Sequence, residues 1–138
     1  MKRLFLDANV VVRHLTQDVP EQGRRARDLL KRVETGELQV TILESAVAEI
    51  VYVLGSKRLY NLPRERIRDD VGGILALRGM KLTHKRACIV ALELYAAHPH
   101  LSFVDALNAA RAGREKDAAV VSFDKGFDRA GGARRQEP

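Results

Sequence analysis

Short apolar segments alternate with amphipathic helical patterns along the whole chain, and this alternation limits the folds that the chain can adopt. The expected strands are the apolar segments 3–7, 38–43, 80–84 and 118–123. Helical patterns fill the intervals, at about 10–15, 20–35, 45–54, 63–78, 85–98 and 102–112. Strands that alternate with helices form a parallel sheet with helices on both faces. We therefore predict a three-layer α/β fold with ligands at the carboxyl ends of its strands.

Length and composition indicate one globular domain. The 138 residues are 46% hydrophobic and 30% charged, which suits a packed core and argues against a disordered chain. We expect the domain to span residues 1–130. The following stretch, 131–138, is too polar for a good central strand, so we expect a tail or a weak edge strand there. The single cysteine, Cys88, lies in an apolar stretch and excludes an internal disulfide, so we expect a buried thiol.

Charge and aromatic content restrict the partners. A net charge of +6 favours polyanions, although it also serves solubility alone. With 5% aromatic residues and no Trp, base stacking on exposed rings is disfavoured. No apolar run approaches the ~20 residues that span a membrane, and Asp7, Asn9 and Arg13 interrupt the apolar stretch that a signal peptide needs. We expect a cytoplasmic protein that does not bind membranes.

Four carboxylates stand beside apolar segments that are expected to be buried: Asp7, Glu49, Asp105 and Asp124. A buried carboxylate without a partner is costly, so a helix cap or a metal ion has to compensate for it. Each acid has an ordinary alternative role. These alternatives are a helix cap at Asp7 or Asn9, a capping box from Ser102 to Asp105, a turn from Asp124 to Gly126, and a surface position for Glu49.

Taken together, the four acids favour a metal site. The carboxyl ends of parallel strands meet at one edge of a sheet, so these side chains are expected to converge there. Converging carboxylates raise one another's pKa unless a cation neutralises them. Oxygen ligands suit Mg²⁺ or Mn²⁺ and not zinc, and we expect all four histidines at the surface. Phosphodiester hydrolysis is the chemistry that combines such a metal site with a basic surface.

Three cations near these acids are candidates to contact substrate phosphates. Lys125 and Arg129 adjoin Asp124, and Arg13 follows Asn9 on the same expected helix. The basic runs RRARDLLKR and RERIRDD are typical of solvated helix faces, with substrate contact as the alternative.

Four segments in this order resemble a PIN domain, and most closely a VapC-type toxin of the bacterial toxin–antitoxin systems. The segments are LFLDANVVVRHL, ESAVAEIVYVL, LSFVDALNAARA and VVSFDKGFDRAGG. The resemblance implies a metal-dependent endoribonuclease that cleaves single-stranded regions of RNA. It also implies an α/β/α sandwich with a central parallel sheet of four to five strands.

The resemblance assigns roles by position. The catalytic residues that would hold Mg²⁺ or Mn²⁺ are Asp7, Glu49, Asp105 and Asp124. Asn9 and Ser122 would support them by orienting carboxylates or water. Asp128 is a further acid whose place, at the metal or at the surface, the resemblance leaves open.

Partners and rival functions follow from the same comparison. The family implies a homodimer and a small antitoxin of the VapB type, with the helix faces 46–54 and 67–75 as candidate contacts and core packing as their alternative. A catalytically inactive PIN-like RNA-binding or scaffold protein stays open. So does a receiver-type Mg²⁺-binding signalling domain, although such a domain would carry paired acids after its first strand.

Overall fold

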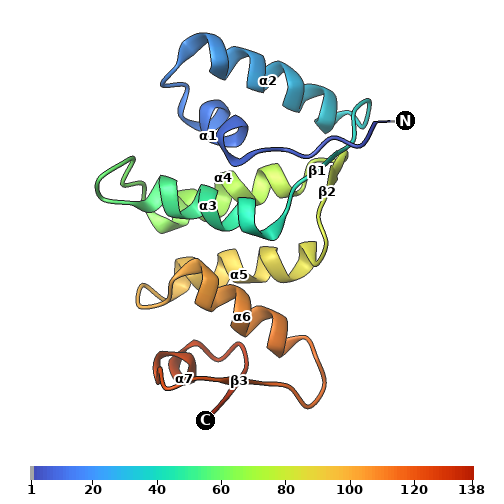
Figure 1. Cartoon of the computed structure of the whole chain (residues 1–138). Coiled ribbons are helices and arrows are strands. Elements are labelled where there is room, and N and C mark those ends of the chain that lie inside the picture. Colours follow the sequence, from blue (N-terminus) through green and yellow to red (C-terminus); the bar gives the residue numbers. More distant parts are fainter. Residues whose placement is uncertain (1) are drawn as a thin grey trace. The chain divides into compact units, whose positions relative to one another are not determined.

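The computed structural model describes residues 2–138, which form a mixed α/β fold of helices and short parallel strands (Figure 1). The chain divides into two compact units, Met1–Thr83 and His84–Pro138. Within the described residues, no helix combines the length and the hydropathy needed to cross a membrane.

The first unit contains four helices and one pair of strands. They are α1 (Ala8–Thr16), α2 (Pro20–Glu34), β1 (Val40–Thr41), α3 (Glu44–Gly55), α4 (Arg64–Leu75) and β2 (Met80–Lys81). Helix α1 packs against both α2 and α3, and α3 packs against α4 (Figure 1). Strands β1 and β2 are parallel, with Val40 opposite Met80 and Thr41 opposite Lys81.

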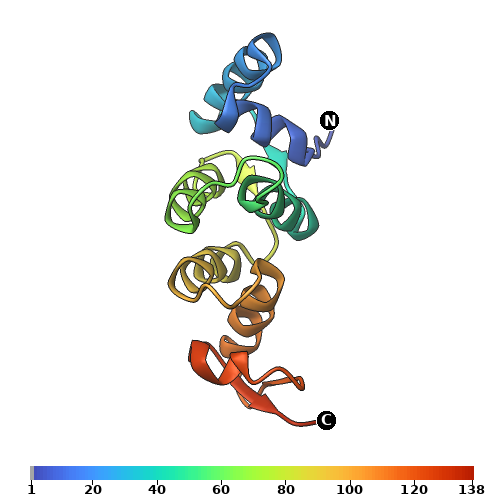
Figure 2. The same ribbon diagram turned by 90° about the vertical axis from the view of Figure 1, so that its left-hand side faces the viewer.

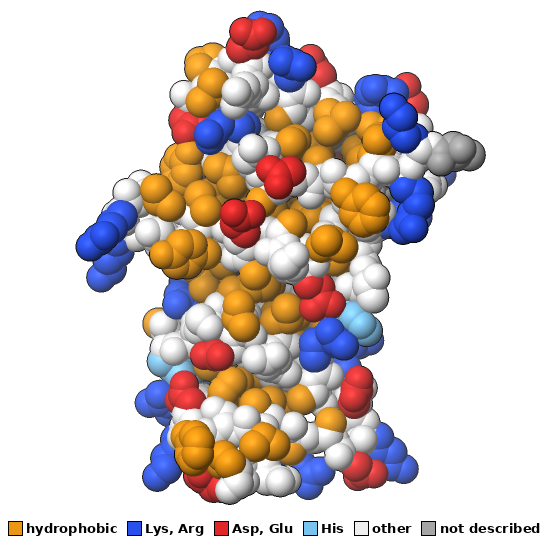
Figure 3. Space-filling view, in the orientation of Figure 1, with side chains coloured by type: hydrophobic (Ala, Val, Ile, Leu, Met, Phe, Trp, Pro, Cys, Tyr) orange, Lys and Arg blue, Asp and Glu red, His pale blue; other side chains and the backbone are white. Residues whose placement is uncertain are grey.

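The core of this unit is made by the apolar helix faces that the sequence predicts. The apolar residues that recur at helical spacing in α3 and α4 are each at most 5% exposed: Val47, Ile50, Val51, Leu54, Ile67, Val71, Ile74 and Leu75. Burying one such side chain contributes about 1.5–3 kcal/mol to the free energy of unfolding. Core packing by these residues is therefore enough to explain why the helix faces 46–54 and 67–75 are apolar. Exposed hydrophobic side chains do remain, and Figure 3 shows some of them among acidic and basic groups; Phe5, Leu43 and Tyr52 belong to this class.

The second unit contains α5 (Lys85–Ala97), α6 (Phe103–Gly113), β3 (Ala119–Val121), α7 (Gly126–Ala130) and β4 (Arg134–Gln136). Helices α5 and α6 lie side by side in both views (Figure 1, Figure 2). Cys88 is fully buried, as predicted, and the Tyr95 and Phe103 rings meet edge to face with their centroids 6.3 Å apart.

The strands are shorter than the sequence predicts. Among residues 2–138 there are two two-stranded parallel sheets, β1–β2 and β3–β4, and not one larger sheet. The expected first strand, 3–7, makes a single bridge, from Phe5 to Thr41. Phe5 is 58% exposed, so this segment is not the fully buried strand that its apolar residues indicate. The single sheet of four to five strands therefore stays a prediction.

The polar C-terminal stretch forms a short strand, which is the second of the two alternatives expected for residues 131–138. Strand β4 pairs in parallel with β3. Arg135 makes this possible, because its side chain is only 10% exposed and forms ion pairs with Asp128 and Glu137. Its guanidinium also donates to the carbonyl of Ser122 at 3.0 Å. The hydrogen bonds that Arg135 donates to the two carboxylates raise the pKa of Arg135 above its ordinary value, so the charge is retained.

Gly79 follows the helical pattern expected at about 63–78, but it does not end that helix. Helix α4 ends at Leu75, before Gly79 is reached. A Cβ at residue 79 would lie 2.0 Å from the Leu38 carbonyl oxygen, because two backbone segments approach each other closely there. The Gly79 amide also donates to the Val33 carbonyl at 2.8 Å.

This close approach predicts opposite outcomes for two alanine substitutions. Gly79→Ala should destabilise the protein by about 1–3 kcal/mol through overpacking. Gly73→Ala is the matched control, because nothing lies within 4 Å of a Cβ at this helical position; it should stabilise α4 by about 0.5–1 kcal/mol. Urea unfolding measures both changes, and equal shifts for the two variants would contradict the interpretation.

The surface prediction is wrong for His98 and for His14, which are both partly buried. His14 lines a hollow of ≈ 450 Å³ together with Arg27 and Asp70. Its Nδ1 atom is buried and has no hydrogen-bond partner within the described part of the chain. Burial lowers the pKa of His14 most, the positive charge of Arg27 lowers it further, and Asp70 acts in the opposite direction.

We therefore expect protonation of His14 to weaken the fold. Because the folded-state pKa lies below the ordinary 6.5, the unfolded chain binds more protons. The stabilisation is complete above pH 6.5 and is lost as the pH falls from there through the folded-state pKa. The unfolding free energy should decrease from about pH 7.5 to about pH 5.5, and this decrease should be smaller in His14→Gln than in wild type. His84→Gln, at an exposed histidine, should keep the wild-type dependence.

Candidate active site

Asp7 lies where the first segment meets helix α1, and it caps that helix. Its Oδ2 atom accepts a hydrogen bond of 3.3 Å from the Asn9 amide. Leu6 and Ala8 on either side are buried, whereas Asp7 itself is exposed. The expectation of a buried carboxylate is therefore wrong at this position. Capping uses only one carboxylate oxygen, so the other is available to a ligand.

Glu49 shares a cavity with Asp7. The cavity is ≈ 590 Å³ and is lined by Phe5, Leu6, Asp7, Leu43, Ser45, Ala46 and Glu49. Glu49 is exposed although its neighbours Val47 and Ile50 are fully buried, so the turn of α3 that enters the core also presents this carboxylate to the cavity. The lining contains no cationic side chain, and within the described residues neither carboxylate forms an ion pair.

Asp105 occupies the first turn of α6, in the second unit. The Ser102 hydroxyl caps this helix and accepts a hydrogen bond from the Asp105 amide at 3.1 Å. This is the predicted cap. It engages only the backbone amide of Asp105 and does not use the Asp105 carboxylate. The carboxylate is partly buried at a helix N-terminus, where the helix dipole favours negative charge.

Asp124 lies in the loop between β3 and α7, which two hydrogen bonds fix. The Ser122 hydroxyl accepts from the Asp124 amide at 2.9 Å, and the Asp124 Oδ1 atom accepts from the Gly126 amide at 2.7 Å. Ser122 thus positions the backbone of the acid that it was predicted to support. The predicted turn continues into α7, a short helix that the sequence pattern does not indicate.

His100 is a residue of this loop region that sequence reasoning missed. Its Nε2 atom lies 3.1 Å from the Gly126 carbonyl oxygen, and a Cβ at residue 126 would lie 3.1 Å from the His100 ring. His100 therefore connects the approach to α6 with the loop that carries Asp124. No pattern in the sequence joins residues so far apart in the chain, so only the fold could indicate this contact.

The other predicted site residues of the second unit differ in whether they already form ion pairs. Asp128 pairs with Arg135 at 3.1 Å, which ties it to the C-terminal strand. Lys125 and Arg129 are exposed, and among residues 2–138 they form no ion pair.

Arg13 is held by several groups of its own unit. Its guanidinium donates to Gln22 at 3.1 Å and approaches Asp18 and Tyr60 at 3.4 Å each. Asp18 in turn accepts hydrogen bonds from Tyr60 and Thr16, and these hydrogen bonds lower the pKa of Asp18 most. Arg13 therefore links α1 to the loops after it and after α3, and its charge is already compensated.

The four carboxylates fit a hard divalent cation by their chemistry. All are oxygen donors, and none of them has a cationic partner among the residues described. Asp7 and Glu49 belong to the first unit, and Asp105 and Asp124 belong to the second. Within residues 2–138, no three His, Cys, Asp or Glu side chains gather closely enough to hold a metal ion.

The PIN domain family model matches residues 4–133 of the chain. The chain belongs to the PIN domain family. The matched range covers nearly the whole length and includes all four carboxylates. PIN domains are generally nucleases and typically use divalent metal ions, so this PIN domain is a member of a nuclease-type superfamily. A comparison with curated proteins finds no match for it.

The helix cap that Asp7 makes and the metal contact expected of it predict different effects of two substitutions. Asn caps helices about as well as Asp, so Asp7→Asn should leave the unfolding free energy in EDTA within about 0.5 kcal/mol of wild type. Asp7→Ala removes the cap and should cost about 0.5–2 kcal/mol. Mg²⁺ should raise the melting temperature of wild type by mass action and raise that of Asp7→Asn less.

Thermal melts with EDTA and with Mg²⁺ check this prediction. If Asp7→Asn is as unstable in EDTA as Asp7→Ala, the cap is not what the carboxylate supplies. If Mg²⁺ shifts wild type and Asp7→Asn equally, Asp7 is not a metal ligand.

Proposed function

We propose that this PIN domain is a divalent-metal-dependent endoribonuclease that hydrolyses phosphodiester bonds in single-stranded regions of RNA. The observation that carries the proposal is the cavity shared by Asp7 and Glu49, two carboxylates that have no cationic partner within the described residues. Placing negative groups together without compensation is unfavourable unless a cation binds them. Membership of a nuclease-type superfamily makes phosphodiester hydrolysis the chemistry that this arrangement serves.

In this proposal, the ligands of Mg²⁺ or Mn²⁺ are Asp7, Glu49, Asp105 and Asp124. Such an ion, when bound, lowers the pKa of water and neutralises charge on the phosphate. The chain itself orients the donors, because the Asn9 amide holds one oxygen of Asp7 and the Ser122 hydroxyl holds the Asp124 backbone. Asp128 is not needed as a ligand, since Arg135 already pairs with it.

Basic side chains bring the RNA to these acids. Lys125 and Arg129 flank the Asp124 loop with their charges exposed, and they would contact backbone phosphates. Arg13 is less suited to that role, because Asp18 and Gln22 already bind its guanidinium. The net charge of +6 supports attraction of a polyanion as a whole.

The finer predictions from the resemblance belong to the same proposal. They are a VapC-type toxin role, a cytoplasmic location, a homodimer, a small VapB-like antitoxin, and one central parallel sheet of four to five strands. Their support is the order and spacing of the four motifs, all of which the family match includes.

Cleavage of a labelled single-stranded RNA by the purified protein tests the proposal. We expect cutting with Mg²⁺ or Mn²⁺, none with EDTA, and a loss of about 100-fold or more in Asp105→Asn, since even partners outside the ligand shell change activity about 10–100-fold. Asp117→Asn is the matched control, because this exposed acid has a left-handed backbone that Asn also adopts readily, so wild-type activity is expected.

Two outcomes would contradict the proposal. Equal activity of Asp105→Asn and Asp117→Asn would remove Asp105 from the site. Tight RNA binding without cutting, by a folded protein that Mg²⁺ stabilises, would instead indicate an RNA-binding PIN-like protein without catalysis.

A further inference from the structure

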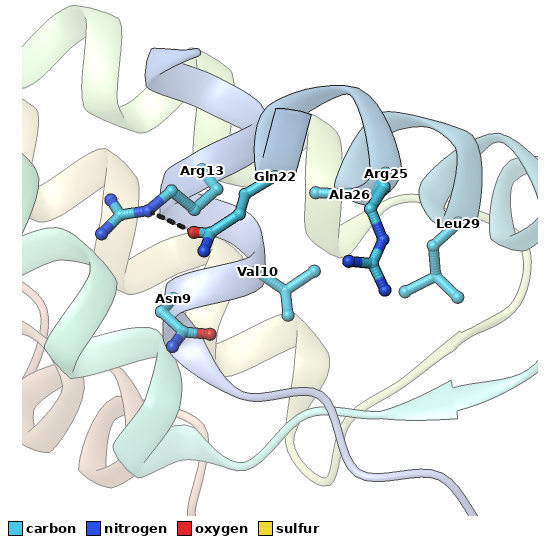
Figure 4. Close-up of a pocket in the computed structure, with 7 residues that line it drawn as sticks. All are labelled: Asn9, Val10, Arg13, Gln22, Arg25, Ala26 and Leu29. Carbon is cyan, nitrogen blue, oxygen red and sulfur yellow. Dashed lines mark hydrogen bonds between the residues drawn. The ribbon is translucent and has the colours of Figure 1, made fainter. Parts of the chain in front are cut away.

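Another cavity lies in the first unit, between helices α1 and α2 (Figure 4). We call it the α1–α2 groove, and its volume is ≈ 440 Å³. Its lining residues are Asn9, Val10, Arg13, Gln22, Arg25, Ala26 and Leu29. This volume lies within the ~300–1,000 Å³ typical of small-molecule pockets. The groove can therefore hold a group of the size of one nucleotide.

The lining of the groove has an apolar and a polar part. Val10, Ala26 and Leu29 provide aliphatic surface, and Ala26 is buried at 6% exposure. In Figure 4, the side-chain amide of Asn9 and the guanidinium of Arg25 lie on either side of the Val10 side chain. The Gln22 side chain stands on the same lining with its Oε1 atom bound to Arg13. Such a lining suits a ligand with a flat apolar face, polar edges and a negative charge.

Arg25 is the cation of this groove that is available to a ligand. Arg13 already contacts Gln22, Asp18 and Tyr60. Arg25 is exposed, and within the part of the chain that the structure describes it makes no hydrogen bond or ion pair. Its planar guanidinium matches the geometry of a phosphate group.

We propose that the α1–α2 groove binds one nucleotide of the RNA substrate, the one next to the cleaved bond, with Arg25 on its phosphate and Asn9 and Gln22 at the base edge. This inference rests on the proposed nuclease function. Its position follows from Asp7, since the backbone amide of Asn9, whose side chain lines the groove, donates to the carboxylate of this candidate metal ligand. The residues that select the base at the cut are then Asn9 and Gln22.

A protein segment is the other class of ligand that a groove of this kind could take. An apolar segment would bury the Arg25 guanidinium and the Asn9 amide without partners, which is unfavourable. A nucleotide satisfies both, because it carries a phosphate and hydrogen-bonding base edges on an apolar ring. The net charge of the chain, +6, favours the same ligand.

Binding of a fluorescent single-stranded RNA in Mg²⁺ tests the inference, in an Asp105→Asn background that does not cut. Arg25→Gln should weaken binding about fivefold to tenfold, and it should reduce the slope of log affinity against log salt by about 0.7, the value of one single-strand phosphate contact. Arg24→Gln is the matched control, since this neighbouring arginine is exposed and does not line the groove. It should change affinity less than about twofold.

Photo-crosslinking gives a second readout that does not depend on a variant. An RNA with 4-thiouridine next to the cut should crosslink to peptides that contain residues 9–13 or 22–29. Crosslinks confined to other peptides would overturn the inference, as would equal affinities and salt slopes for Arg25→Gln and Arg24→Gln.

The failure of the inference and the failure of the proposed function are distinguishable. If wild type neither binds nor cuts RNA, the nuclease function fails and the nucleotide site fails with it. If wild type cuts RNA in a metal-dependent way while Arg25→Gln behaves like Arg24→Gln, only the nucleotide site is wrong. The α1–α2 groove would then be a surface for a protein partner.

Discussion

Backbone pairing along β1 is the interaction on which the first unit and its acidic cavity depend. On one side, the Leu6 amide donates to the Thr41 carbonyl at 2.7 Å, and the Thr41 amide donates to Leu4 at 2.8 Å. On the other side, β1 pairs with β2. The hydrogen bonds between the first segment and β1 stop at Leu6, one residue before Asp7. After β1, the chain soon enters α3, which carries Glu49. Asp7 and Glu49 therefore line the same cavity although 41 positions separate them in the sequence.

The structure also shows that a helix cap and a metal ligand are compatible roles for one carboxylate. Asp7 caps α1 through one oxygen, and the Ser102 hydroxyl caps α6 so that the Asp105 side chain is not needed for capping. In both helices the cap fixes the backbone beside an acid. This removes the conflict between the two interpretations that the sequence leaves open. It also explains why an acid can stand at these positions in a metal-free chain without destabilising the helix.

Residues whose environment is local are the ones that sequence reasoning predicts well. The apolar spacing of α3 and α4 predicts their buried faces, and Pro20 stands at the first position of α2 as expected. Three further features depend on contacts between different elements of the fold. His14 is partly buried by α2 and α4, Gly79 meets the backbone near Leu38, and strand β4 forms because Arg135 finds carboxylates on both sides. Hydropathy alone cannot indicate any of these contacts.

The resemblance of four motifs identified the family, and the sequence by itself determined helices α1–α6, the mixed α/β class and the identity of the candidate ligands. It did so because apolar periodicity and the acids beside it are properties of neighbouring residues. Only the tertiary structure decided that Asp7 is exposed, that Arg13 is engaged by Asp18, and that Arg25, which has no partner within residues 2–138, stands in a groove beside Asn9. The reason is physical. Exposure and charge compensation depend on which groups the fold brings within a few ångströms, and the pattern along the chain does not contain that information.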